Sequence, residues 1–205
     1  MMTDTIDIAP KLRGRPREFD MDAALDEALR VFSERGYHAA SISELTEAMG
    51  LTAGSVYKAF GDKRGIFLAA FDRYRQVRQP LIEACLAEAA NGRAKLFALT
   101  AFFAESSCGE IGRRGCLVVG SATELALFDE EIAGRVATAF NLDERRILDL
   151  IRLGQADGSI SQHVDAEGIA CAILCLTKGM RVIGKTDPKP ERMLAVAEAA
   201  MKLLN

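Results

Sequence analysis

Apolar residues recur every three or four positions along almost the whole chain, the spacing that gathers them on one face of an α-helix. The first clear stripe lies between Asp20, a good N-cap residue, and Gly36, which favours helix termination. It consists of Ala24, Leu25, Ala28, Leu29 and Phe32. Segments in which apolar and polar residues alternate, as in half-buried strands, do not occur. The pattern therefore predicts an all-α fold.

Two short helices are expected next, separated by a tight turn. Ser41 followed by Glu44 three residues later is typical of a capping box and places a helix start near residue 41. Gly50 breaks this helix, and Thr52 can cap a third one almost at once. Such a short connection between two helices is typical of a helix-turn-helix.

The rest of the chain predicts a series of longer helices. We expect a helix over 62–78 that Pro80 resets, a glycine-rich loop over 107–115, and a C-terminal pair beginning near residues 169 and 193. The helices between them are expected over 80–90, 94–106, 116–127 and 129–154.

Residues 51–63 carry a specific motif. They read Leu-Thr-Ala-Gly-Ser-Val-Tyr-Lys-Ala-Phe-Gly-Asp-Lys and are followed by Ile66 and Phe67. With its surroundings (19–71, about a quarter of the chain), this segment resembles the DNA-binding domain of the TetR family of bacterial transcriptional repressors. It departs from the family pattern at Ala40-Ser41, where a Thr is common, and at Lys58, where a His is common. The resemblance implies a basic arm (1–18), a helix-turn-helix domain (19–65), and a helical regulatory and dimerisation domain (66–205).

The candidate DNA contacts follow from the helix periodicity and from the arm. Val56 and Phe60 face inward, which leaves hydroxyls, a methyl group and a cation for phosphates and base edges. In the arm, Gly14 and Pro16 prevent a helix, so its arginines are presented on an extended chain suited to a minor groove. A solvated tail is the alternative for the arm, and a half-buried packing role is the alternative for Tyr57. The expected contacts are Arg13, Arg15, Arg17, Ser41, Thr52, Ala53, Ser55, Tyr57, Lys58 and Lys63.

The charge balance argues against bulk electrostatic attraction to DNA. The chain has a net charge of −3, and residues 1–65 hold nine Lys and Arg against eleven Asp and Glu. DNA affinity must then depend on where the cations lie, on the arm and on a second subunit.

The last two predicted helices favour assembly. Their apolar positions recur at spacings of four and three, which suits packing against a partner helix. In the family that the sequence resembles, the two C-terminal helices of each subunit form a four-helix homodimer interface. The candidate interface residues are Ile169, Ile173, Leu176, Met180, Ile183, Met193, Val196, Ala200 and Leu203, unless these residues pack only within their own chain.

The middle helices are rich in aromatic residues, and the resemblance implies that they enclose a pocket for a small-molecule effector. An ordinary hydrophobic core is the alternative for each residue. The candidate lining is Phe71, Tyr74, Phe97, Phe102, Phe103, Glu124 and Phe128.

The five cysteines form no C-x-x-C pair, and the only two histidines, His38 and His163, are isolated from them, so we expect neither a disulfide framework nor a metal site. Cys108 and Cys116 flank a loop that holds two arginines, and nearby cations lower a thiol pKa. Reaction of these thiols with an oxidant or an electrophile is therefore a second hypothesis for regulation. Cys171 and Cys175, on an apolar helix, are expected to be buried and inert.

No segment is long and apolar enough for a membrane span, and the N-terminus lacks an apolar signal core, so we expect a cytoplasmic protein. The sequence predicts no cofactor. A helical enzyme is the hypothesis from another class, but the sequence offers no nucleophile–base pairing, metal set or phosphate-binding loop for it.

Overall fold

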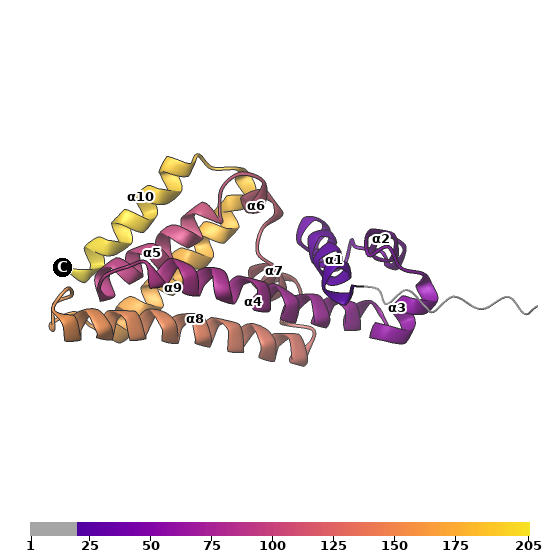
Figure 1. Ribbon diagram of the computed structural model, residues 1–205, viewed down its shortest axis with the longest axis horizontal. Helices are drawn as coiled ribbons and strands as arrows, with labels where there is room; N and C mark the ends of the chain where they lie inside the picture. The colour runs from indigo at the N-terminus through magenta and orange to yellow at the C-terminus, as the bar shows by residue number, and fades with distance from the viewer. Residues whose placement is uncertain (1–19) are drawn as a thin grey trace, which may run out of the picture.

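The computed structural model describes residues 20–205, and this range contains only helices, with no strand. The all-α prediction is confirmed. Three helices form a bundle at one end of the molecule (Figure 1), here called the N-terminal bundle: α1 (Met21–Arg35), α2 (Ile42–Ala48) and α3 (Ala53–Phe60). The remainder consists of α4 (Lys63–Ala87), α5 (Gly92–Glu105), α6 (Gly109–Arg114), α7 (Leu117–Glu124), α8 (Glu130–Asp157), α9 (Ala166–Ile183) and α10 (Pro190–Met201), with short 3₁₀ turns at Gly184–Thr186 and Lys202–Leu204. None of the helices in the described range is both long and apolar enough to cross a bilayer.

The first helices begin where their capping residues predict. The Asp20 carboxylate accepts hydrogen bonds from the backbone N–H groups of Asp22 and Ala23. The Ser41 hydroxyl accepts from the Glu44 N–H at 3.1 Å, and the Glu44 carboxylate accepts from the Ser41 N–H at 3.2 Å. The predicted capping box is therefore confirmed.

Two predicted breaks are corrected. Pro80 does not end a helix, because α4 runs through it from Lys63 to Ala87. A proline removes one N–H bond to the carbonyl four residues earlier, but Pro80 and Gln76 are both exposed, so water can satisfy that carbonyl. The expected loop over 107–115 also contains the short helix α6, and α8 extends three residues beyond the predicted end.

One hydrophobic core joins the N-terminal bundle to the rest of the chain. The buried side chains of α1–α3 and of the first half of α4 form a single cluster with residues of α7 and α8. From these two helices, and from Leu125 directly after α7, the cluster takes Leu117, Val118, Leu125, Ile132, Val136 and Ala139. The domain boundary expected at residue 65 lies in the first turn of α4, within this shared packing.

A second core fills the end of the molecule away from the bundle, among α5, α8, α9 and α10. Gly92 of α5 lies so close to α8 that a Cβ atom there would come within 2.1 Å of the Gly154 nitrogen. These helices therefore cross at backbone contact distance, which requires glycine.

An ion pair connects the start of α4 to the start of α8. The Arg64 guanidinium donates to both carboxylate oxygens of Asp129, at 2.6 and 2.9 Å, and also to Glu131 at 2.8 Å. Asp129 in turn caps α8 by accepting from the Ile132 and Glu131 N–H groups. The Arg64 hydrogen bonds, together with those N–H groups, lower the pKa of the Asp129 carboxyl to about 2.

This lowered pKa predicts a pH-dependent contribution to stability. The folded state binds the Asp129 proton less tightly than the unfolded chain, so the contribution is complete above about pH 4 and is lost as the pH falls towards about 2. Asp129→Asn keeps a residue that can cap α8 but removes the charge. We expect the variant to have a lower urea midpoint than the parent above about pH 4, with the two curves converging near pH 2. A difference that does not change with pH would contradict this role of the Arg64–Asp129 pair.

Candidate nucleic-acid interface and regulatory cavity

The helix α3 presents one exposed face at the end of the molecule. Val56 is buried and anchors the helix, while Thr52, Ala53, Tyr57 and Lys58 are exposed and Ser55 is half-buried. The Thr52 hydroxyl caps the helix by accepting from the Ser55 N–H at 3.2 Å. Tyr57 is 54% exposed, so about half of its side chain is open to solvent. The exposed face carries hydroxyl, methyl and cationic groups that suit phosphate and base-edge contacts.

Two of the predicted contacts also have structural tasks. Ser41 is occupied in the α2 capping box. The Lys63 ammonium donates to the Ala40 carbonyl at 2.8 Å and to the His38 carbonyl at 3.4 Å, and it lies 4.6 Å from the centroid of the Tyr37 ring. Lys63 therefore fixes the segment before α2. The arm residues Arg13, Arg15 and Arg17 lie outside the described residues.

The acidic residues of α1 are paired with arginines. Arg73 of α4 bonds to Asp22 at 2.7 Å and to Asp26 at 2.8 Å. Arg30 bonds to Glu27 and Glu34, and Arg114 of α6 also contacts Glu34. These pairs reduce the negative potential of a bundle that the amino-acid counts describe as acidic.

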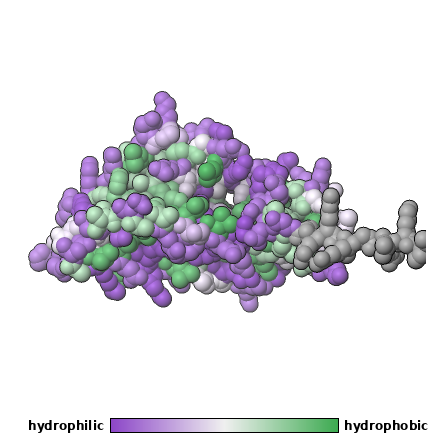
Figure 2. Space-filling view, in the orientation of Figure 1, coloured by the Kyte–Doolittle hydropathy of each residue, from purple (hydrophilic) through white to green (hydrophobic). Residues whose placement is uncertain are grey.

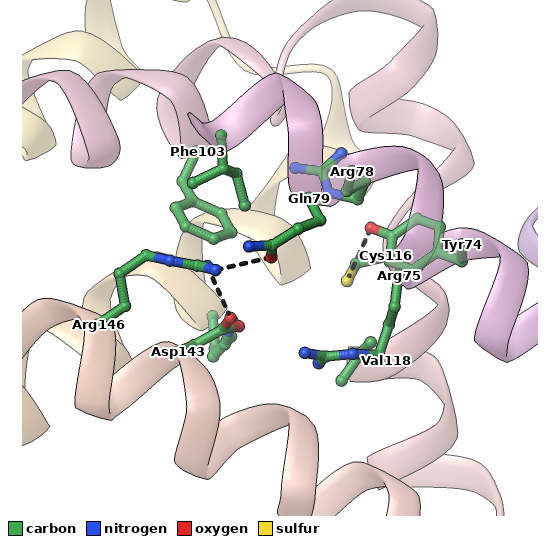
Figure 3. A pocket seen from close by; sticks show the side chains of 11 residues that line it. Tyr74, Arg75, Arg78, Gln79, Phe103, Cys116, Val118, Asp143 and Arg146 are labelled. Atoms are coloured by element: carbon green, nitrogen blue, oxygen red, sulfur yellow. Dashed lines mark hydrogen bonds and ion pairs between the residues drawn. The ribbon is translucent and has the colours of Figure 1, made fainter. Parts of the chain in front are cut away.

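A small cavity lies between α4 and α8 (Figure 3). Residues of α5, α7 and α9 also line it, and its volume of about 40 Å³ is room for a few water molecules. Among the predicted pocket residues, Tyr74 and Phe103 line it. Cys116 lines it as well, together with Arg75, Arg78, Gln79, Ile82, Val118, Asp143, Arg146 and Lys178.

The other predicted pocket residues lie elsewhere. Phe71 is buried in the core shared with the N-terminal bundle, and Phe102 packs at the edge of the second core. Phe97 and Phe128 face outward and are 37% and 83% exposed. Helical spacing alone could not distinguish inward from outward positions, so the proposed lining is corrected to the cavity around Tyr74 and Phe103.

The polar lining was missed because its residues interrupt apolar stripes. Arg78 is four residues after Tyr74, so it lies on the same face of α4. Lys178 is a charged position among the mostly apolar residues of α9. A charged residue on the predicted inner face of a helix was the sequence signal that could have identified this polar lining.

Glu124, at the C-terminal end of α7, contacts the N-terminal bundle instead of the cavity. Its carboxylate accepts from the Tyr37 N–H at 3.1 Å and from the His38 N–H at 2.9 Å. Both N–H groups belong to the segment between α1 and α2. A single short helix therefore reaches the cavity through Cys116 and Val118 and reaches the bundle through Glu124.

The Cys116 thiol has an unusual environment. It accepts a hydrogen bond from the Tyr74 hydroxyl at 3.2 Å (Figure 3). Burial raises the pKa of the Cys116 thiol, but the positive charge of Arg181, the Tyr74 hydrogen bond, the Val119 N–H and the charge of Lys178 outweigh it, so the pKa lies below its usual range. Cys108 differs, because burial and nearby carboxylates raise its pKa. Of the two predicted redox cysteines, only Cys116 has a pKa that its surroundings lower.

Two family models match the chain: "Bacterial regulatory proteins, tetR family" over residues 24–70, and "Tetracyclin repressor-like, C-terminal domain" over residues 92–200. The HTH-type transcriptional repressor ComR of Escherichia coli (strain K12) is 31% identical over 204 residues, which cover 99% of this chain and 97% of ComR. The chain belongs to the TetR family. It is therefore a DNA-binding transcriptional regulator.

Two further regulators resemble the chain over most of its length. The transcriptional regulator AcuR of Cereibacter sphaeroides is 29% identical over 203 residues, covering 93% of this chain and 90% of AcuR. A cysteine mutant of the TetR family regulator CifR, solved in complex with 26-bp double-strand operator DNA, is 32% identical, with a TM-score of 0.83 over 94% of this chain and 100% of CifR.

The predicted dimer seam of this TetR-family chain lies mostly on the inner face of its last two helices. Ile173, Met180, Met193 and Ala200 are at most 2% exposed within the single chain. Ile169, Leu176 and Val196 pack at the edge of the same core, and only Ile183 and Leu203 are exposed, each by 40%. The spacing of apolar residues in α9 and α10 identified the faces by which these helices pack within their own chain, and not a surface open to a partner. The assignment of these buried residues to a dimer interface is therefore corrected.

The outer faces of these helices carry apolar groups of their own. Cys171, Cys175 and Val182 of α9 and Leu194 of α10 are exposed. The expectation that Cys171 and Cys175 are buried is therefore wrong. Figure 2 shows hydrophobic side chains gathered over the α5–α10 region, whereas hydrophilic ones cover most of the visible face of the N-terminal bundle.

No group of three or more His, Cys, Asp or Glu side chains within residues 20–205 is arranged to hold a metal.

The Tyr74 hydrogen bond predicts a measurable shift in thiol chemistry. Tyr74→Phe removes the hydroxyl that favours the Cys116 thiolate, so the Cys116 pKa should rise. We expect the midpoint of the alkylation rate against pH to move upward, measured by mass spectrometry in a chain whose other four cysteines are Ser. Thr123→Val, which removes an exposed hydroxyl elsewhere in α7, is the control. An unchanged midpoint in Tyr74→Phe would show that the hydroxyl does not stabilise the thiolate.

Proposed function

We propose that this TetR-family chain is a repressor that binds a palindromic operator as a homodimer and releases it when a small molecule occupies the cavity between α4 and α8. The observation that carries the proposal is the exposed face of α3, with its cap at Thr52 and with Tyr57 and Lys58 open to solvent. The name of ComR as a repressor and the operator complex of CifR support it.

The outer faces of α9 and α10 are the surface we assign to the second subunit. Val182 is 54% exposed and Leu194 is 40% exposed, and exposed apolar side chains on neighbouring helices favour a protein interface. A two-fold dimer would present two copies of α3 about one helical turn of DNA apart, as a palindrome requires.

Helix α7 is the route we propose from the cavity to the DNA-binding bundle. Its first turn lines the cavity, its buried residues share the core of the bundle, and its last residue holds the backbone of Tyr37 and His38. Because this packing is continuous, a displacement of α7 by a ligand changes the orientation of the bundle. Occupancy then favours orientations in which two copies of α3 no longer fit both half-sites.

Alkylation of Cys116 is a second candidate signal, favoured by its lowered pKa and its contact with Tyr74. In this step the thiolate attacks an electrophilic carbon, a C–S bond forms and the leaving group departs. Cys116 also borders a narrow gap between α1 and α7 that Tyr37 and Glu124 line. An added group there would reach the contact between α7 and the N-terminal bundle.

The first prediction of the proposed function concerns DNA recognition. Selection from a random duplex library should yield a palindrome, and Lys58→Ala should weaken binding to it by about 1–3 kcal/mol. If Lys58 contacts a phosphate, the affinity of the variant should also depend less steeply on salt. The slope of log affinity against log salt should then be smaller in magnitude by about one. Arg145→Ala, an exposed charge on α8, serves as the matched control. An enzyme without a DNA role would give no palindrome and no steep salt dependence.

The second prediction concerns the α7 route. Treating a chain with Cys116 as its only cysteine with iodoacetamide should weaken operator binding by about fivefold or more. Glu124→Gln retains only one acceptor oxygen for the two N–H groups, so it should lower operator affinity before treatment and reduce the response to alkylation. Glu88→Gln, an exposed carboxylate at the end of α4, should behave as the parent. A full alkylation response in Glu124→Gln would exclude this route.

A further inference from the structure

The cavity between α4 and α8 carries an excess of positive charge. Arg75, Arg78, Arg146 and Lys178 line it, and Asp143 is the one carboxylate in its lining. Figure 3 shows Arg75 and Arg78 on α4 and Arg146 and Asp143 on α8, with Arg146 bridging to Gln79 of α4. Lys178 belongs to α9.

The single carboxylate is already used. Asp143 accepts from the Lys178 ammonium at 2.5 Å and lies 3.7 Å from Arg146. Arg146 otherwise donates to the neutral Gln79 side chain at 2.7 Å. Arg78 donates to the Ser106 hydroxyl at 3.2 Å and lies over the Phe102 ring at 4.9 Å. Arg75 makes no hydrogen bond or ion pair with any residue in the part of the chain that the structure describes.

A buried arginine beside the cavity makes the imbalance larger. Arg181 is only 1% exposed, and its Nε and Nη1 atoms have no hydrogen-bond partner among residues 20–205. Its Nη2 atom donates to the Gly115 carbonyl, next to Cys116. A guanidinium held away from water without a carboxylate partner is costly, so this region favours a bound anion.

We infer that the cavity takes a small carboxylate, and this inference names the ligand class of the effector in the proposed function. The carboxylate group suits the planar fork of a guanidinium such as that of Arg75 or Arg78. Ile82, Phe103 and Val118 supply apolar surface for a short hydrocarbon tail. The small volume excludes a large hydrophobic effector from the cavity in this conformation.

The test uses sodium propionate as the probe and the full chain without DNA. We expect a saturable rise in melting temperature, with a dissociation constant between about 10 µM and about 1 mM, the range that so few ligand atoms permit. Propionamide, which has the same shape without the charge, should produce no saturable shift, and neither should sodium chloride at equal ionic strength. An equal response to the amide or to chloride, or no response to propionate, would overturn the inference.

Variants place the binding in this cavity. Arg75→Gln removes a cation without disturbing the Asp143 pairs and should weaken propionate binding by about tenfold. Arg145→Gln, an exposed charge on the same helix as Arg146, is the matched control and should bind as the parent. Arg78→Gln provides a second test if Arg75→Gln is destabilised. Propionate binding of parent strength in both folded cavity variants would place the anion elsewhere and overturn the assignment.

Operator binding is measured separately with the selected palindrome in the absence of propionate. Failure of DNA binding together with normal propionate binding would refute the proposed function but leave the carboxylate site intact. Normal DNA binding with no propionate response would refute the carboxylate site alone.

Discussion

The shared packing between the N-terminal bundle and helix α7 is the constraint on which the rest of the structure depends. The buried residues of α1–α3 form one core with Leu117 and Val118 of α7, with Leu125 directly after it and with the start of α8. Close-packed interiors transmit displacements instead of absorbing them. The bundle that presents α3 therefore cannot keep its orientation if α7 moves, and the Glu124 carboxylate adds a polar contact at the same junction.

Electrostatics divides the molecule into two regions. Around α1, carboxylates are paired with Arg30, Arg73 and Arg114, so an acidic bundle can still present the cationic Lys58 to DNA. Around Cys116 the balance is reversed, because Arg181, Lys178 and the cavity arginines exceed the carboxylates. The same excess of positive charge lowers the pKa of the Cys116 thiol and favours an anionic ligand. Both proposed signals, ligand binding and alkylation of Cys116, therefore act at the N-terminal end of α7.

The sequence predicted those parts of the fold that depend on contacts between residues close together in the chain. The caps at Asp20, Ser41 and Thr52 place the starts of α1–α3 because a side-chain oxygen satisfies free N–H groups within three residues. Pro80 was misinterpreted because the cost of a proline depends on whether water reaches the released carbonyl, which only the folded structure determines.

The cavity between α4 and α8 was less predictable, because it depends on contacts between helices far apart in the chain. Periodicity grouped Phe97 and Phe128 with Tyr74 and Phe103, although the first two face outward. Arg146 and Lys178 reach the cavity only through the packing of α8 and α9 against α5. For the same reason, the apolar spacing of α9 and α10 identified their inner faces, and their outer faces could be recognised only in the folded chain.

The most direct test of this account is the distance between the two α3 helices in a complex with the selected operator. A spin label at Ala59→Cys, an exposed position of α3, in a chain whose native cysteines are all Ser, reports this distance by pulsed electron paramagnetic resonance. We expect a single, narrow distance near one helical turn of DNA, about 34–36 Å, that broadens when Glu124→Gln is added. A complex with no dipolar coupling between labels, or a distribution that Glu124→Gln leaves unchanged, would contradict it.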